Sequence, residues 1–267
     1  MLRQPAVANR FYPGSPKELE KMVATLLPDT TVVKKPALAV VSPHAGYLYS
    51  GELAAQTLGQ VIIPETVIIL GPNHQGRGAL VALSLASWNM PNGIVPSDRK
   101  TAEQLLAASP HITADEDAHL YEHSLEVQVP FLQALQPKLS LVPITVSHIS
   151  YQICTEVAQA LGSVIKKSDK SPLILASTDM THFESRTSAS RKDNLALQKI
   201  TSFDPAGLYR IVQDEQISMC GFIPVTIALL AAQMLGGTKA DIIGYTDSGA
   251  VSGDTEQVVG YAGLVIS

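Results

Sequence analysis

Several side chains that can bind a metal ion or move a proton follow apolar segments of this sequence. His44 lies in S-P-H-A-G-Y directly after one apolar run, and His74 lies in G-P-N-H-Q-G after the next. Asp179 and His182 follow a third run in S-T-D-M-T-H. Because the carboxyl ends of strands in an α/β sheet meet at one crevice, where ligands usually bind, we expect these side chains to share one site. Neutral imidazole is a common transition-metal ligand, so the pattern predicts a metal centre.

Asp179 and His182 stand three residues apart, a spacing that places two side chains on one face of a helical turn. On such a turn Asp179 can orient an imidazole, and His182 can act as a general acid or base. The alternative is structural, with Asp179 capping the turn that follows it. A lone histidine in a turn is also usually a structural hydrogen-bonding group. The metal hypothesis for His44 and His74 therefore requires the two strand ends to lie close together.

The two cysteines receive different predictions. Cys220 precedes Gly221 and the longest apolar helix, where the helix dipole favours loss of the thiol proton and predicts a thiolate ligand. The alternative is a small buried hydrophobe, the usual fate of a free cysteine. Cys154 lies inside an amphipathic helical pattern, and we assign it that second role. Two cysteines without a C-x-x-C motif give no disulfide framework.

A cluster of charged residues precedes another apolar helix. It contains Glu122, His123 and Glu126, the last two at helical i, i+3 spacing. By itself this cluster is typical of a solvated, charged first turn. We expect the remaining histidines to be ordinary surface residues: His111, His119 and His148.

The composition is that of a folded globular protein without a basic surface. Hydrophobic residues make up 46% of the 267 residues and charged residues 16%, which excludes a disordered chain. The net charge of −5 argues against nucleic-acid binding. The N-terminus lacks the apolar region of a signal peptide, and the longest apolar stretch, 221–237, falls short of the roughly 20 residues of a membrane span. We therefore expect a cytoplasmic protein without a membrane segment.

Apolar periodicity predicts strands that alternate with helices. Short apolar or β-branched runs predict buried strands at 37–42, 66–70, 80–85, 139–146, 172–176 and 258–266. Helical spacing predicts helices at 16–27, 51–58, 97–108, 123–135, 153–165, 195–200, 205–212 and 221–235. Ser15 should cap the first helix, and Pro130 should kink the fourth. The alternation predicts an α/β fold, a single-domain sandwich over 1–267 with a central mixed sheet flanked by helices.

Six co-linear motifs make the sequence similar to one known family. They are R-Q-P-A-V-A-N-R-F-Y-P, P-H-A-G-Y-L-Y-S-G, G-P-N-H, E-H-S-L-E-V-Q-V-P-F-L, S-T-D-M-T-H-F and M-C-G-F. These motifs resemble the Memo family, whose prokaryotic members are called AmmeMemoRadiSam system protein B. The resemblance runs in order from about Arg3 to the last predicted strand. One departure is Asn9, which stands where glycine is usual in the first motif.

The resemblance implies a fold similar to that of the class III extradiol dioxygenases, which are non-haem iron enzymes. It implies His44, His74 and Cys220 as metal ligands, so that a thiolate replaces the carboxylate of the extradiol enzymes. It places Asp179 and His182 in the same pocket as candidate catalytic residues. Two further motif residues contribute to that pocket: His123 as a proton relay and Tyr49 as a substrate contact.

Three functions are compatible with these residues. The favoured one is a redox-active metalloprotein, because a His2Cys site with open positions suits Fe(II) or copper, both able to activate dioxygen. The second is a non-catalytic metal- or peptide-binding interaction module. The third is a zinc hydrolase in which His182 serves as the base. The resemblance also implies partners among the proteins of the same AmmeMemoRadiSam system, and the small-molecule or peptide ligand stays open.

Overall fold

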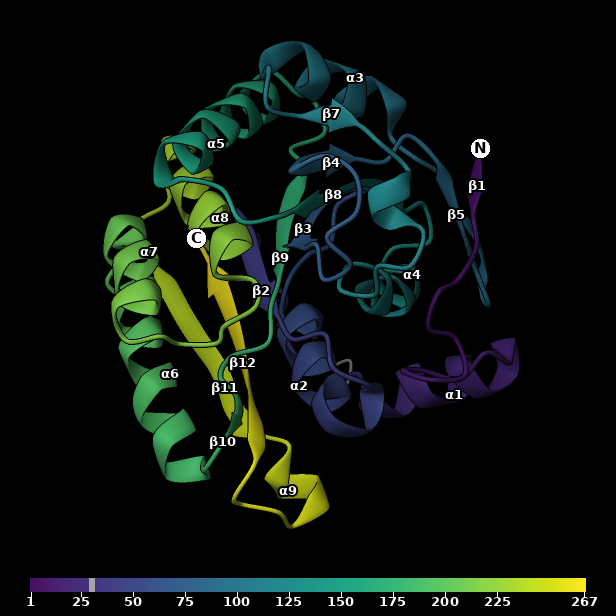
Figure 1. Ribbon diagram of the computed structural model, residues 1–267. Helices are drawn as coiled ribbons and strands as arrows, with labels where there is room; N and C mark the ends of the chain where they lie inside the picture. The colour runs from purple at the N-terminus through teal and green to yellow at the C-terminus, as the bar shows by residue number, and fades with distance from the viewer. Residues whose placement is uncertain (29–31) are drawn as a thin grey trace.

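The computed structural model describes residues 1–28 and 32–267, and it has helices on both faces of a central sheet (Figure 1). The helices are α1 Pro16–Leu26, α2 Tyr47–Gly59, α3 Arg99–Ala108, α4 Val129–Leu135, α5 Tyr151–Lys166, α6 Arg186–Thr201, α7 Pro205–Asp214, α8 Phe222–Met234 and α9 Gly249–Ser252. Short 3-10 helices span Asp117–His119 and Glu126–Gln128. The predicted α/β fold with a central mixed sheet flanked by helices is confirmed.

The main sheet has the strand order β10-β12-β2-β9-β3-β8-β4-β7, and β11 pairs with β12. Its strands are β2 Ala39–Ser42, β3 Thr66–Pro72, β4 Val81–Leu83, β7 Thr113–Ala114, β8 Ser140–Val146, β9 Leu173–Ser177, β10 His182–Glu184, β11 Ala240–Asp247 and β12 Val258–Ile266. The adjacent strands β2, β9, β3 and β8 run parallel, whereas β12 and β4 run antiparallel to their neighbours β2 and β8. The carboxyl ends of the four parallel strands therefore lie at one edge of the sheet.

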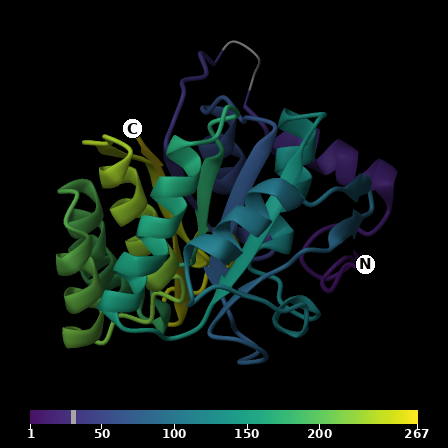
Figure 2. The same cartoon turned by 90° about the horizontal axis from the view of Figure 1, so that it is seen from above.

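Alternate residues of the central strands pack against opposite helical layers, as strand geometry requires. Val40 and Ile69 belong to the core beneath α1, α2 and α4. Val41 and Ile68 belong to the core shared with α5, α7 and α8. Figure 2, seen from above, shows the helices on the two sides of the sheet. Because both faces are covered, the strands are apolar along their whole length, which is why the sequence shows them as continuous apolar runs.

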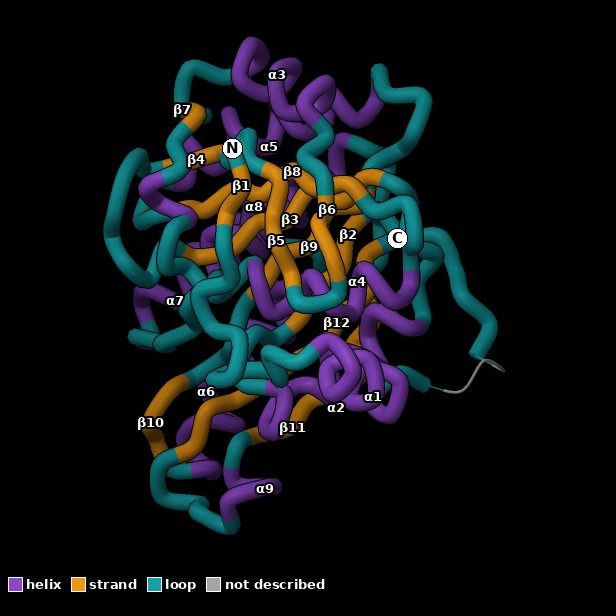
Figure 3. Tube along the Cα trace, turned by 90° about the vertical axis from the view of Figure 1, so that its right-hand side faces the viewer, coloured by secondary structure: helices purple, strands orange, loops and turns teal. Residues whose placement is uncertain are grey.

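A second, smaller sheet holds the N-terminus. It has the order β1-β5-β6 and is formed by β1 Leu2–Arg3, β5 Ser87–Met90 and β6 Gly93–Val95. Figure 3 shows these strands side by side. The guanidinium carbon of Arg3 lies 4.2 Å from the ring centroid of the buried Trp88, a cation–π arrangement that fixes the start of the chain.

The structure corrects several local predictions. The helix predicted at 123–135 begins only at Val129, and Pro130 lies in its first turn rather than kinking it, because proline lacks the N–H that a first turn leaves unpaired. Ser15 precedes α1 but makes no side-chain capping hydrogen bond. His119, expected at the surface, is buried and its Nε2 lies 3.0 Å from the carbonyl oxygen of Ala82. Strands β1, β5, β6, β7, β10 and β11 were not predicted.

Asn9 adopts the left-handed backbone conformation, with φ of 65°. Glycine is usual at this position of the motif, and asparagine is the residue that tolerates this conformation best after glycine. The Asn9 side chain accepts a hydrogen bond from the backbone N–H of Gly14 at 2.9 Å. Asn9 is therefore compatible with this turn, and the ring of Phe11, two residues further on, lies 4.8 Å from that of His123, centroid to centroid.

None of the helices in the described part of the chain has the length and apolar character that crossing a membrane demands.

Candidate metal centre

Three loops leave the sheet at the carboxyl ends of neighbouring parallel strands. His44 lies two residues beyond β2, His74 two residues beyond β3 and Asp179 two residues beyond β9. Strands β2 and β3 are not adjacent, since β9 lies between them. The loop that carries Asp179 therefore starts between the loops that carry the two histidines.

The structure brings three histidines together. His44, His74 and His123 each offer a ring nitrogen within 4.8 Å of those of the other two. The ring of His123 stacks on that of His74 with centroids 4.6 Å apart, and the His44 ring meets both edge-on, at 5.2 Å from His74 and 5.5 Å from His123. His123 comes from a loop before α4. The predicted helical first turn at this residue is wrong.

Hydrogen bonds decide which nitrogen of each ring is free. The Ser177 hydroxyl donates its only proton to the carbonyl oxygen of Ser124, so it must accept from Nδ1–H of His44, 3.0 Å away. The Nδ1 of His74 lies 2.9 Å from a carboxylate oxygen of Glu122, and it therefore also carries a proton. In the neutral form of both rings this leaves the lone pair on Nε2, the form in which imidazole binds a metal.

Glu122 is the main organising residue of the site. Its carboxylate accepts hydrogen bonds from the backbone N–H groups of His74, His123 and Ser124 as well as from the His74 ring. Burial raises the pKa of Glu122, but these hydrogen bonds and the neighbouring His74 lower it more, to about 2. Glu122 and Glu126 are fully buried, so the prediction of a solvated charged turn is wrong. The apolar residues around them, Leu125 and Val127, were the signal in the sequence.

Cys220 approaches the cluster on the side of His44. Its Sγ lies 3.3 Å from Nε2 of His44 and accepts a hydrogen bond from the backbone N–H of Asp179, also at 3.3 Å. Burial raises the pKa of the Cys220 thiol, and the charge of Asp179 raises it further. The predicted loss of the thiol proton at the start of α8 is therefore wrong for the protein without a cation. A bound cation would favour the thiolate.

Asp179 and His182 are not on a helical turn, because the chain between them forms no regular secondary structure and His182 begins β10. Asp179 accepts a hydrogen bond from the backbone N–H of His44 at 2.8 Å, and its other oxygen lies 4.0 Å from Nε2 of that ring. Burial raises the pKa of Asp179 to about 6 against the effect of these hydrogen bonds. His182 directs Nδ1 at the carbonyl oxygen of Ser218, 2.9 Å away, so Nδ1 carries a proton.

Burial disfavours the charged form of two histidines of the cluster, His44 and His123. Burial lowers the pKa of His44 well below its ordinary value, and the three neighbouring histidines lower it further. Burial also lowers the pKa of His123, to about 4, although Glu122 acts in the opposite direction. Neutral imidazoles beside a thiol and a carboxyl form a donor set that fits a transition-metal ion.

Tyr49, the predicted substrate contact, lies in the first turn of α2 with 40% of its surface exposed.

The N-terminal segment supports the loop that carries Glu122 and His123. The Arg3 guanidinium donates to the carbonyl oxygens of His119 and Glu122 at 2.8 and 2.6 Å, and it pairs with the buried carboxylate of Glu126. Glu126 in turn accepts hydrogen bonds from the first motif: from Ala6 N, Val7 N and the Tyr12 hydroxyl. The first and fourth sequence motifs thus form one buried network.

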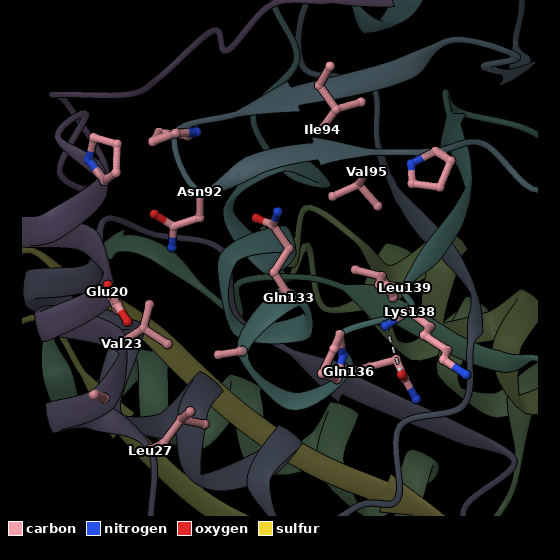
Figure 4. A pocket seen from close by; sticks show the side chains of 16 residues that line it. Glu20, Val23, Leu27, Asn92, Ile94, Val95, Gln133, Gln136, Lys138 and Leu139 are labelled. Atoms are coloured by element: carbon pink, nitrogen blue, oxygen red, sulfur yellow. Dashed lines mark hydrogen bonds between the residues drawn. The ribbon is translucent and has the colours of Figure 1, made fainter.

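A large cavity lies elsewhere (Figure 4). It has a volume of about 980 Å³ and is lined by residues of α1, the β5–β6 hairpin, α4 and the segment that leads into β8. It includes Leu139, which precedes β8 and therefore lies at the amino end of the parallel strands. None of the clustered histidines lines it. Ligands of open α/β sheets bind at the opposite, carboxyl edge, so the histidine cluster is the better candidate site.

Gly221 allows α8 to start close to the end of β9. A Cβ atom at this residue would lie 2.5 Å from the carbonyl oxygen of Ser177 and 2.6 Å from Cβ of Thr178.

We expect Gly221→Ala to displace Cys220 from His44 and to cost about 1–3 kcal/mol of stability, as overpacking does. Thermal unfolding and metal titration measure both effects. Gly46→Ala is the control, because its Cβ would meet nothing closer than 3.6 Å. Equal behaviour of the two variants would contradict this role of Gly221.

Comparison with known proteins gives one family over almost the whole chain. The model of the family described as Memo-like protein matches residues 3–265. A MEMO1 family protein of Methanopyrus kandleri is 39% identical, with 99% of each chain covered. Another, from Aquifex aeolicus, is 38% identical over 99% of this chain and 98% of its own. The crystal structure of an uncharacterized protein from Escherichia coli K12 covers 83% of this chain and 98% of its own, with a TM-score of 0.58. At 14% identity, that likeness concerns the fold alone.

Proposed function

This chain belongs to the Memo-like protein family, and from that premise we propose that it is a redox-active non-haem metalloprotein. Its ion, Fe(II) or copper, is held at the carboxyl ends of the parallel strands by His44, His74 and Cys220. The observation that carries the proposal is the convergence of three imidazoles, one ring nitrogen of each within 4.8 Å of those of the others, beside a thiol 3.3 Å from one of them. A mixed nitrogen and sulfur donor set suits ions that change oxidation state.

Once bound, an Fe(II) or copper ion would supply electron transfer and activation of dioxygen. The protein's own residues do the remaining work. Glu122 holds the His74 ring in the orientation that binds the ion. Asp179, which has a carboxylate oxygen 4.0 Å from Nε2 of His44, accepts and returns a proton. His123 and His182 complete the proton relay, and Tyr49, at the partly exposed start of α2, contacts the substrate.

A second candidate function is zinc-dependent hydrolysis. It is favoured by the histidine cluster, since three imidazoles are a ligand set of catalytic zinc. In that case His123 is a ligand rather than a relay, and Asp179 or His182 acts as the base. Proteins of the same AmmeMemoRadiSam system remain the proposed partners in either case.

Metal titration of two cysteine variants tests the proposal. Cys220→Ser should lower the affinity for Fe(II) or Cu by at least about tenfold, because a hydroxyl does not ionise near neutral pH and is a poor substitute for a thiolate ligand. Cys154→Ser is the matched control. Cys154 is fully buried in α5, where burial raises its pKa to about 12, and this variant should bind metal normally at a cost of about 1 kcal/mol in stability.

Oxygen uptake by the loaded protein with a mild reductant then tests redox activity. We expect uptake by the wild type to exceed that of Cys220→Ser and His44→Ala. Equal uptake by all three proteins would mean that free metal in solution is responsible. A spectroscopically silent zinc site would favour the hydrolase instead, and a centre without turnover would favour a binding module.

A further inference from the structure

A pocket of about 410 Å³ opens beside His123. One wall comes from the N-terminal segment and the other from the loops that follow β3 and precede α4. The pocket is therefore built where the first motif meets the histidine cluster. Its lining includes Val7, Arg10, Phe11, Gln75, Tyr121 and His123.

Arg10 gives this pocket a positive charge without an internal partner. Among residues 1–28 and 32–267, no carboxylate forms an ion pair with the Arg10 guanidinium. The nearby Arg77 differs, because its guanidinium is held by Asp117 at 2.6 Å and lies over the ring of Tyr121. Arg10 is close enough to the cluster for its charge to contribute to the lowered pKa of His123, after burial and His74.

The remaining walls are apolar or weakly polar. The Phe11 ring lies 4.8 Å from that of His123, centroid to centroid, and Tyr121 is 60% exposed. Val7 is buried and contributes little accessible surface, and Gln75 can donate or accept a hydrogen bond. A guanidinium beside aromatic side chains is suited to a small organic anion, since its fork of N–H groups matches an acid's oxygens and the aromatic rings cover the carbon skeleton.

The charge around the pocket favours a single negative charge on that anion. The Arg10 guanidinium, which has no ion-pair partner in the described part of the chain, lines it, whereas the ionised Glu122 lies next to His123 in the chain and contacts it. A carboxylate carries one charge, and a phosphate monoester carries nearly two at neutral pH. We propose that this pocket is a recognition subsite of the metal centre, in which Arg10 binds the carboxylate of a small organic acid and places it against the ring of His123. This inference rests on the proposed function, because the acid is the substrate of that centre.

NMR titration of the metal-free full-length protein tests the subsite. The probes are sodium benzoate, its neutral isostere benzamide, and phenyl phosphate, each added to the wild type and to Arg10→Gln. We expect benzoate to shift the ring signals of His123 and Tyr121. Arg10→Gln should lower the affinity for benzoate by at least about tenfold, as the loss of a charge-assisted contact does. Benzamide should bind the wild type at least about tenfold more weakly than benzoate does.

Arg99→Gln is the matched control, because Arg99 is an exposed arginine in α3 and should leave benzoate binding unchanged. Equal affinity of wild type and Arg10→Gln for benzoate, or no binding of benzoate at all, would overturn the subsite. Tighter binding of phenyl phosphate than of benzoate would overturn its assignment to carboxylates. A failure of the proposed metal centre can be distinguished from a failure of the subsite, because these titrations contain no metal. Arg10→Gln should also bind metal like the wild type.

Discussion

Glu126→Leu should lower the free energy of unfolding by about 3–5 kcal/mol, because it leaves the buried guanidinium of Arg3 without its counter-charge. The substitution also removes the acceptor for the backbone N–H groups of Ala6 and Val7 and for the Tyr12 hydroxyl. The first motif should then detach from the loop before α4. Denaturant unfolding, followed by the fluorescence of the single tryptophan and by circular dichroism, measures the loss.

The double variant Arg3→Met/Glu126→Leu separates charge from packing. Removing both members of a buried ion pair is usually far less costly than removing one, so the double variant should recover part of the lost stability. A Glu126→Leu protein within about 1 kcal/mol of the wild type would show that this network does not hold the N-terminal segment in place.

Glu122→Gln should reduce metal affinity by about ten- to a hundredfold while the protein stays folded, as the loss of a carboxylate that orients a histidine ligand does. The glutamine keeps the size of the side chain but has one acceptor oxygen for the N–H groups that the carboxylate now serves. The His74 ring then loses its fixed orientation. Competition of the variant with a chromophoric chelator for the ion gives the affinity.

Glu156→Gln is the control for this experiment. Glu156 also pairs with a histidine, His111, but both side chains are partly exposed and lie outside the cluster. This variant should bind metal like the wild type. If Glu122→Gln retained full affinity, the His74 orientation would not depend on the carboxylate.

The strand ends of the site were predictable from the sequence, and the reason is burial. Strands such as β2 and β3 are covered on both faces, so they appear as uninterrupted apolar runs, and the residues just beyond them are easily identified. His44 and His74 were recognised in this way. The parallel strand order that brings the two loops to one edge depends on long-range pairing. Local patterns predicted β9 as a strand but not its position between β2 and β3.

The orienting residues were not predictable for a different reason. Glu122 looks like a surface charge in the sequence, and its burial depends on backbone N–H groups that the folded loop directs at it. Ser177 is one serine at the end of an apolar run, and only the structure shows its hydroxyl between His44 and Ser124. Cys220 was noticed for its place before a helix, but burial outweighs the helix dipole in setting its protonation.

The sequence motifs of the family have a common physical basis in this structure. The first motif is tied down by Glu126, and the fourth supplies Glu122 and His123. The fifth supplies Ser177 and Asp179, and the sixth supplies the thiol that contacts His44. Segments far apart in the chain thus orient one group of free nitrogens.

X-ray absorption spectroscopy of the protein loaded with one equivalent of Fe(II) or Cu tests the central claim most directly, because it reports the atoms bound to the ion. The proposed centre should show imidazole nitrogens at about 2.0–2.1 Å and one sulfur at about 2.3 Å, taking zinc distances as the reference. The sulfur should disappear in Cys220→Ser and persist in Cys154→Ser. A wild-type spectrum with only oxygen neighbours, or a sulfur that remains in Cys220→Ser, would contradict a centre built from His44, His74 and Cys220.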